Sequence, residues 1–377
     1  MTATASTQAT DLFAKAQNVL AGGVSASMRL HPYLGRPLYV SRGDGPYLYD
    51  LDGKRYIDFN VSNGAALLGH NHPKIREAVL HGLDLGVICA AETTYHEQLA
   101  AKLVEIIPAA QRVRFASVGG EVTLVALRIA RTATGRQKYL KFDGHFHGLT
   151  EPWLFKKADP FDLNSEIVPS SGGVPADQGA DVLMVPWNNV DVFKAAMDAH
   201  GNELAAVFCE PIHYNAGCIP PVDGCLELRR EETTKHGVVL VFDEVLSGFR
   251  TALGGVQAQS GVTPDLTTHA KALANGLPLS SVSGRVDLME QLAPTGTAVH
   301  SGTYSGTCSA FWRRWRRLQN SASQACTTAS TRPPVSFTPS SRASSTAPVY
   351  PCWSRARARA SGSTSAGASR SRPGPTP

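Results

Sequence analysis

The sequence predicts an α/β fold with a mainly parallel β-sheet and helices on both of its faces. From about residue 110 to residue 285, short β-rich runs alternate with amphipathic helical stretches, which is the pattern of βαβ units. Several of the β-rich runs, such as "VVLVF", are apolar at every position, as is typical of strands covered on both faces. With 377 residues, the chain is long enough for a large core and two domains.

The first βαβ unit begins at "RVRFAS", which we expect to be a strand. It leads into "EVTLVALRIARTATG". There Leu124, Leu127 and Ile129 with Ala130 give a helix its apolar face, and Gly135 provides a stop. The same alternation continues through the strands and the charged helix predicted at "KYLKF", "AAVFCE", "LELRREETTKHG" and "VVLVFDEV".

An antiparallel meander is expected before this block. The stretch "PLYVSRGDGPYLYDLDGKRYIDF" alternates apolar and polar residues around the turn signals Asp44-Gly45 and Asp52-Gly53. We therefore divide the chain into an N-terminal segment with the meander (1–65), a large α/β domain (66–306) and a low-complexity basic tail (307–377).

Charge is distributed unevenly along the chain. The net charge is +5, yet residues 307–377 contain eleven arginines and no Lys, Asp or Glu. Residues 1–306 therefore hold 25 basic and 31 acidic side chains and are mildly acidic. Any affinity for nucleic acid would have to come from the tail.

Other classes of protein are disfavoured by composition. No apolar run is long enough to cross a membrane, and the start "MTATASTQATDLF" lacks the layout of a secretory signal, so we expect a cytoplasmic protein. The seven cysteines include no C-x-x-C pair, which indicates reduced thiols. The histidines of "GHNHP" and "GHFHG" have no third ligand at a supporting spacing, so we expect turn and loop roles and no metal site.

Polar residues follow three strands of the predicted sheet. Asp243 ends "VVLVFDE", Glu210 ends "AAVFCE", and Lys271 comes after "DLTTH". Ligands of open parallel sheets gather outside the carboxyl ends of the strands, so we expect these side chains to share one binding site. Taken singly, each is more often an ion pair or a helix cap than a catalytic group.

Together these residues match the needs of one cofactor, pyridoxal 5'-phosphate (PLP). PLP requires a lysine amine for a Schiff base, an acid that keeps its ring nitrogen protonated, backbone amides for its phosphate and a flat face for stacking. These four parts would come from Lys271, Asp243, the turn at Gly119 and Gly120, and Phe146.

Eight motifs carry a family resemblance: "GGVSASMR", "DGKRYIDF", "GHNHP", "RIARTATGRQKYLKFDGHFHG", "EPIHYNAGCIPP", "VFDEVLSGFR", "GVTPDLTTHAKALANGLP" and "HSGTYSG". With them, roughly residues 15 to 306 resemble the class III PLP-dependent aminotransferases, and most of all the branch that contains glutamate-1-semialdehyde 2,1-aminomutase. The resemblance implies a fold-type-I PLP transferase that moves an amino group between an amino acid and a keto acid. The alternative activity is that of the aminomutase, which moves the amino group within one molecule.

The resemblance also implies residue roles. Lys271 matches the Schiff-base lysine, which later transfers protons, Asp243 the partner of the ring nitrogen, and Phe146 the stacking ring. Thr303 matches a threonine that reaches the phosphate of the neighbouring subunit, which implies a homodimer with shared active sites. Arg29 matches a position that binds a substrate carboxylate, for which the planar guanidinium is suited.

Two segments depart from the family pattern. The phosphate turn, Ser-Gly-Thr-Glu in the family, reads "VGGE" at residues 118–121, so two hydroxyl donors are missing and we expect weaker cofactor binding. The segment "FKKADPFDLNSEIVPSSGGVP" replaces a glycine-rich gating loop of the aminomutase branch, which favours an ordinary aminotransferase.

The amino-acid composition changes after Gly306, within "HSGTYSGTCSAFWRRWRRLQN". Where the family has a small C-terminal domain, this tail is expected to be disordered, because it cannot bury enough apolar surface. One hypothesis is a basic nucleic-acid-binding arm with stacking tryptophans. The other, which we favour, is a frameshift that would impair activity. Ordinary GC-rich codons for residues 306–328, read from the third base of codon 306, give "HLFGVLAALAALAELSEPGLYDR", an apolar helix with a stop.

Overall fold

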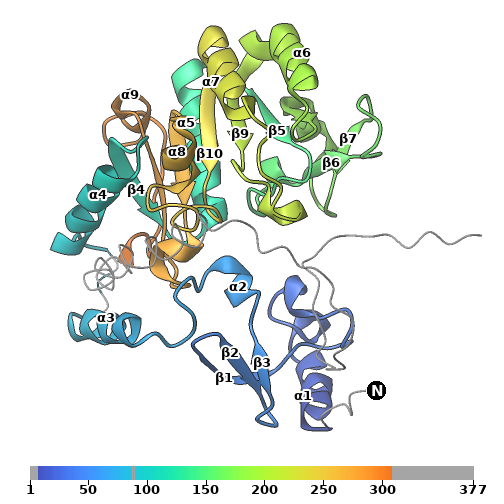
Figure 1. Ribbon diagram of the computed structural model, residues 1–377, viewed down its shortest axis with the longest axis vertical. Helices are drawn as coiled ribbons and strands as arrows, with labels where there is room; N and C mark the ends of the chain where they lie inside the picture. Colours follow the sequence, from blue (N-terminus) through green and yellow to red (C-terminus); the bar gives the residue numbers. More distant parts are fainter. Residues whose placement is uncertain (1–6, 87, 89, 308–377) are drawn as a thin grey trace, which may run out of the picture.

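The computed structural model describes residues 7–86, 88 and 90–307. Its centre is a seven-stranded sheet (Figure 1) with the order β4-β12-β11-β10-β9-β5-β8. Strand β12 is antiparallel to both of its neighbours, and the other pairs are parallel. The strands span β4 Arg112–Ala116, β5 Lys138–Phe142, β8 Val182–Val185, β9 Leu204–Cys209, β10 Val239–Asp243, β11 Leu266–His269 and β12 Ser280–Gly284.

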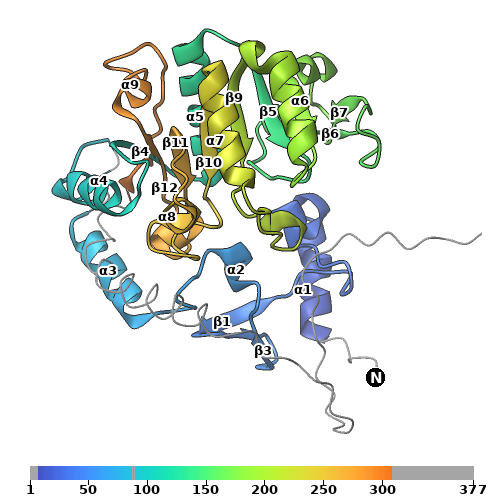
Figure 2. The same ribbon diagram turned by 45° about the horizontal axis from the view of Figure 1, so that its top comes forward.

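Helices cover both faces of this sheet, as predicted. Helix α5 (Gly119–Thr134) packs on one face, and α6 (Val190–His200) and α7 (Cys225–His236) lie side by side on the other, as Figure 2 shows. Strand β10 explains why its run is apolar throughout. Val239 and Val241 belong to the core beneath α5, whereas Leu240 and Phe242 belong to the core beneath α6 and α7.

Helix α5 begins at Gly119 and ends before Gly135, which takes the left-handed conformation (φ 68°) expected of a helix stop. Its apolar face is wider than predicted. Leu127, Ile129 and Ala130 are buried, and so are residues on the neighbouring side of the helix, whereas Leu124 is only partly buried. Contacts with α9 (Val286–Met289) in addition to the sheet account for this wide burial.

The predicted meander is present as a separate three-stranded antiparallel sheet. It is formed by β1 Val40–Asp44, β2 Tyr47–Asp50 and β3 Arg55–Ile57. The remaining helices and strands are α1 Thr7–Gln17, α2 Val61–Gly64, α3 Pro73–Asp84, α4 Thr94–Ile106, β6 Phe155–Lys157, β7 Ile167–Pro169 and α8 Gly255–Ser260. Figure 1 shows the meander and α1 below the large sheet.

The segment after the meander contacts the large sheet's loops directly. Asn275 accepts a hydrogen bond from Leu68 N (2.8 Å) and donates one to Gly69 O (3.2 Å). The Arg250 guanidinium donates to Gly64 O. Of these bonds, the one between Arg250 and Gly64 crosses the boundary expected at residue 65, which stays a prediction.

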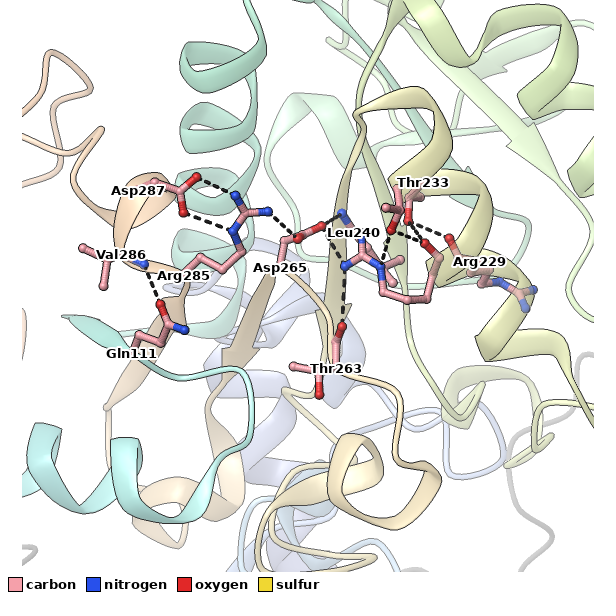
Figure 3. A network of polar contacts seen from close by, with 11 residues as sticks. Gln111, Arg229, Thr233, Leu240, Thr263, Asp265, Arg285, Val286 and Asp287 are labelled. Carbon is pink, nitrogen blue, oxygen red and sulfur yellow. Dashed lines mark hydrogen bonds and ion pairs between the residues drawn. The ribbon is translucent and has the colours of Figure 1, made fainter.

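A polar network joins the amino ends of the central strands (Figure 3). Asp265, just before β11, accepts from Leu240 N (2.8 Å) and pairs with Arg230 (2.9 Å) and Arg285 (3.0 Å). Arg285 also pairs with Asp287 (2.6 Å). A cavity of about 460 Å³ lies beside this network. It is at the amino ends of the central strands, opposite to the carboxyl ends where the binding site is predicted.

Within the described residues, every helix is too short or too polar to cross a lipid bilayer. Residues 308–377 lie outside the described part, so the predicted tail and the two hypotheses about it rest on the sequence.

Candidate active site

Asp243, Glu210 and Lys271 follow the neighbouring strands β10, β9 and β11 at their carboxyl ends. The structure brings their charges together. Asp243 and Glu210 both oppose the lowering of the pKa of Lys271, and Asp243 raises the pKa of Glu210. The three side chains therefore lie close enough to influence one another's charge, and their use as one binding site stays a prediction.

Asp243 is buried and receives three hydrogen bonds. His147 Nδ1 lies 2.7 Å from Asp243 Oδ2, while Thr268 Oγ1 (3.1 Å) and Val245 N (3.0 Å) donate to Oδ1. Burial lowers the pKa of His147, against the opposing effect of Asp243. A neutral His147 donates to the carboxylate through Nδ1, which leaves Asp243 as the negative charge of the pair.

Glu210 is held by the loop that carries Phe146. Phe146 N donates to Glu210 Oε1 (2.7 Å), and the Asn215 side-chain amide donates to both oxygens (2.9 and 3.0 Å). The backbone N of Glu210 in turn donates to His145 Nδ1 (2.9 Å). Burial, followed by the neighbouring Asp243, raises the pKa of Glu210 to about 7. Glu210 is thus poised to gain or lose a proton near neutral pH.

Lys271 opens a short 3-10 helix, Lys271–Ala274, and has a positive φ of 46°. A positive φ is strained for a residue with a side chain. The strain is held by the buried side chains of Ala272 and Leu273 and by the bond from Gly276 N to Lys271 O (3.2 Å). Burial lowers the pKa of the Lys271 amine, which favours the neutral, nucleophilic form.

The start of α5 lies against the 145–149 loop. A Cβ on Gly148 (φ 118°) would lie 2.6 Å from Gly120 Cα, so the two backbones approach too closely for side chains. The Thr123 hydroxyl donates to His147 O and so ties helix and loop together. The free amides at the start of this 16-residue helix are suited to a phosphate.

The other predicted residues are exposed. Phe146 presents a ring that is 48% exposed, open for stacking. Thr303 is exposed in the 301–306 turn, and Arg29 is exposed with its guanidinium bonded to Ser25 Oγ. Among the described residues, neither Arg29 nor Thr303 makes a hydrogen bond or ion pair with Lys271 or Asp243.

Three partners of the site were not predicted as such: His147, Thr268 and Asn215. His147 was expected in a turn, and the structure adds its bond to Asp243. A usable signal existed for Asn215 and His147, because both lie inside the quoted motifs "EPIHYNAGCIPP" and "GHFHG". Thr268, in β11, likewise lies inside the quoted motif "GVTPDLTTHAKALANGLP".

A possible metal-binding group occurs elsewhere, between α6 and α7. Asp198, Glu232 and His236 bring their ligand atoms within 4.8 Å of one another. The Lys235 ammonium already lies between the carboxylates, 3.0 Å from Asp198 and 3.2 Å from Glu232. The cluster thus has its own cation and lies apart from the residues around Lys271.

The residues around Lys271 fit PLP. They supply a partly buried amine of lowered pKa, a buried carboxylate with a neutral histidine behind it, an open aromatic ring and the amino end of a long helix. With PLP bound, these groups would serve as nucleophile, partner of the ring nitrogen, stacking face and phosphate cradle at the carboxyl ends of the strands.

Comparisons with known proteins agree with this chemistry. The class III aminotransferase family model matches residues 31–316. An omega-transaminase from Sphaerobacter thermophilus is 35% identical with a TM-score of 0.77, and the match covers 82% of this chain and 72% of that one. A transaminase with PLP bound is 28% identical with a TM-score of 0.75 (82% and 73% covered). A glutamate-1-semialdehyde aminomutase from Pseudomonas aeruginosa PAO1 is 25% identical with a TM-score of 0.72 (81% and 69% covered).

These matches confirm the resemblance found in the sequence and the fold-type-I architecture of the sheet. Since the family match spans more than half of the chain, the protein belongs to the class III PLP-dependent aminotransferases.

Proposed function

We propose that this protein is a cytoplasmic aminotransferase that moves an amino group between an amino acid and a keto acid, with Lys271 as its catalytic residue. The observation that carries the proposal is the position of the Lys271 amine. It is partly buried and interacts with the carboxylates of Asp243 and Glu210, and burial lowers its pKa. A lowered pKa favours the neutral form of the amine, which is the nucleophile and can afterwards take up and return a proton.

Each surrounding residue has a distinct role in this proposal. Asp243 holds the proton on the ring nitrogen, while Phe146 stacks on one face of the ring. The amides of Gly119 and Gly120 bind the phosphate. PLP, when bound, supplies the electron sink for breaking bonds at the substrate's amino-bearing carbon.

The remaining roles concern substrate and subunits. Arg29 binds the substrate carboxylate with its planar guanidinium. Thr303, which is exposed in this chain, reaches the phosphate of a second subunit, so the active form is a homodimer. The missing hydroxyls of the phosphate turn weaken cofactor binding, because only backbone donors remain there.

The test is covalent labelling of the lysine. The purified 377-residue protein is mixed with PLP, reduced with borohydride and mapped by mass spectrometry. We expect the label on Lys271 and none in Lys271→Ala. Lys138→Ala is the matched control, because Lys138 lies at the exposed start of β5, bound to Glu203. Label on another lysine, or none in folded protein, would contradict the proposal.

An aminomutase is the second candidate, supported by the 25% identical aminomutase structure. The segment at the position of the aminomutase gating loop is here a paired hairpin, in which β6 and β7 are antiparallel and Ala158 N donates to Glu166 O (2.8 Å). An ordered hairpin favours the transferase. Turnover decides between them, because a transferase requires an added keto acid and a mutase converts one substrate alone.

We further propose that a frameshift after Gly306 produced the tail and impairs activity. The family match ends at residue 316, close to the change of composition. Sequencing of the DNA around codon 306 tests this proposal. Salt-sensitive binding of DNA by residues 307–377 alone would instead support the nucleic-acid arm.

A further inference from the structure

The ring of Phe146 is half exposed and lies between two buried histidines. Its side chain is 48% exposed, whereas His145 and His147 on either side of it are buried. Close packing positions a side chain only where neighbours surround it. The setting of the Phe146 ring, on which its proposed stacking depends, therefore relies on how the backbone around it is anchored.

Two hydrogen bonds of opposite direction anchor this backbone to the residue that follows β9. The backbone N of Glu210 donates to His145 Nδ1 (2.9 Å), and the backbone N of Phe146 donates to Glu210 Oε1 (2.7 Å). Each segment thus supplies one backbone donor and one side-chain acceptor. His145 and Glu210 are both buried, where an N–H left without an acceptor is costly. The two bonds together fix the backbone of Phe146 relative to the end of β9.

The bond from Glu210 N also defines the state of the His145 ring. A backbone N–H can only donate, so Nδ1 is the acceptor and the ring proton lies on Nε2. A charged ring carries protons on both nitrogens and could not accept this bond. Burial, followed by the charge of His147, lowers the pKa of His145 well below its ordinary value. The ring is therefore neutral, and Nδ1 keeps its lone pair for Glu210 N.

Stacked side chains hold the His145 ring from its other side. Trp187 packs on it with 4.8 Å between the ring centroids, and the guanidinium of Arg229 in α7 lies 4.5 Å from the Trp187 ring. Arg229 is 1% exposed, and its guanidinium also faces the rings of Phe142 (4.4 Å) and Phe193 (5.4 Å). Attraction between a cation and aromatic faces is stronger where water is excluded. Arg229 thus fixes Trp187, and Trp187 supports His145.

We propose that His145 is a positioning residue for the cofactor, because it ties the backbone beside Phe146 to Glu210, and that Trp187 holds the His145 ring for this task. The inference rests on the proposed function, since it assumes that Phe146 stacks on PLP.

The state of His145 can be tested without cofactor. In protein labelled with nitrogen-15 in its histidines, NMR near neutral pH should show His145 as a neutral ring with its proton on Nε2. The signals are assigned by their loss in His145→Asn. A proton on Nδ1, or a charged ring, would refute the bond to Glu210 N and the inference with it.

Binding of PLP separates the acceptor from the ring. His145→Phe keeps a ring without an acceptor, whereas His145→Asn keeps an acceptor oxygen near the place of Nδ1. For His145→Phe we expect the dissociation constant, from fluorescence titration, to rise about tenfold, as for one lost buried hydrogen bond. The visible circular dichroism of bound PLP, which reports how its ring is set, should weaken. His145→Asn should stay within about threefold of wild type.

The matched control is His200→Phe. His200 ends α6 and its side chain is 47% exposed, so this variant should bind PLP with the affinity and the circular dichroism of wild type.

A second pair of variants tests the stack and decides the matter if His145→Phe does not fold. Trp187→Leu removes the ring between Arg229 and His145, whereas Trp187→Phe keeps one. We expect Trp187→Leu to weaken both PLP binding and its circular dichroism, and Trp187→Phe to preserve most of both. Equal results for the two variants would refute the role of the stack.

Several outcomes would overturn the inference alone. Wild-type affinity and circular dichroism in folded His145→Phe would show that the anchor is not needed. An equal loss in His145→Asn and His145→Phe would assign the role to packing of the imidazole, and a loss of affinity with unchanged circular dichroism would show that the ring setting does not depend on His145. No binding of PLP by folded wild-type protein would instead refute the proposed function and, with it, the inference.

Discussion

At the scale of single residues, the site combines two buried carboxylates that differ in their partners. Asp243 receives a bond from His147, whereas Glu210 receives bonds only from neutral amides. The pKa of Glu210 is raised to about 7 by burial and by Asp243. Glu210 is therefore a group whose ionisation should couple folding to pH.

The raised pKa of Glu210 determines how the free energy of unfolding changes with pH. Above about pH 7 Glu210 is ionised in both states, and burial makes its charge less favourable in the folded chain than in the unfolded chain. Below pH 4.5 the residue is neutral in both states. Stability should fall as pH rises from 4.5 to 7, by up to about 3 kcal/mol from this residue. Glu210→Gln should remove most of that fall in urea unfolding of the protein without cofactor.

Glu166→Gln provides the comparison, because Glu166 is exposed on the β6–β7 hairpin. Its stability should follow wild type across the same pH range. Identical pH slopes for wild type and Glu210→Gln would show that Glu210 does not carry the effect.

The residues of the site were only partly predictable from the sequence. A carboxylate after an apolar run indicates the end of a strand, which located Asp243 and Glu210 correctly. The bond between His147 and Asp243 joins residues 96 positions apart. Such a contact depends on how strands are ordered in the sheet, and no local pattern specifies that order.

At the scale of elements, the two ends of the strands differ in function. The carboxyl ends carry the site, and the amino ends are fastened by Asp265, which links β10, α7 and the residue before α9. Bonds that hold the amino ends of the strands also help to position the side chains at their carboxyl ends.

We expect Asp265→Ala to lower the free energy of unfolding by about 3 kcal/mol or more, because it leaves Arg230 and Leu240 N without their buried partner. Asp287→Ala is the matched control. Asp287 also pairs with Arg285 but its side chain is 61% exposed, so the loss should stay below about 1 kcal/mol. Equal losses measured in urea would show that Asp265 acts only as a surface charge.

The prediction of elements succeeded where the sequence pattern was strong. Apolar runs gave β5, β9 and β10, and Gly135 gave the end of α5. Strand β12 was not predicted, because its sequence "SSVSG" is small and polar. It is a strand because it is completely buried between β4 and β11, a tertiary effect that overrides propensity.

At the scale of the whole molecule, exposed apolar side chains indicate a missing neighbour. Leu80 and Leu83 on α3 are 53% and 56% exposed, and Phe59 near the meander is 84% exposed. Exposed apolar side chains on one helix, such as Leu80 and Leu83, are a feature of protein interfaces when they form part of a larger patch. The proposed homodimer would cover such surface.

Light scattering should give twice the 40.1 kDa mass of one chain. Combined Leu80→Ser and Leu83→Ser should shift the protein towards monomer, because these changes remove apolar area from the interface. Phe161→Ser, on the distant β6–β7 hairpin (Figure 1), should leave the mass unchanged. A monomer at every concentration tested would refute shared active sites.

The contact between Leu68 and Asn275 can form only late in synthesis of the chain. The two residues are 207 positions apart. A ribosome that adds about 5 to 20 residues per second needs roughly 10 to 40 s to make the intervening chain. During that interval the emerging N-terminal part of the chain, up to Leu68, lacks its docking partner. The first sixty or so residues should therefore be the part of the nascent chain that most depends on chaperones.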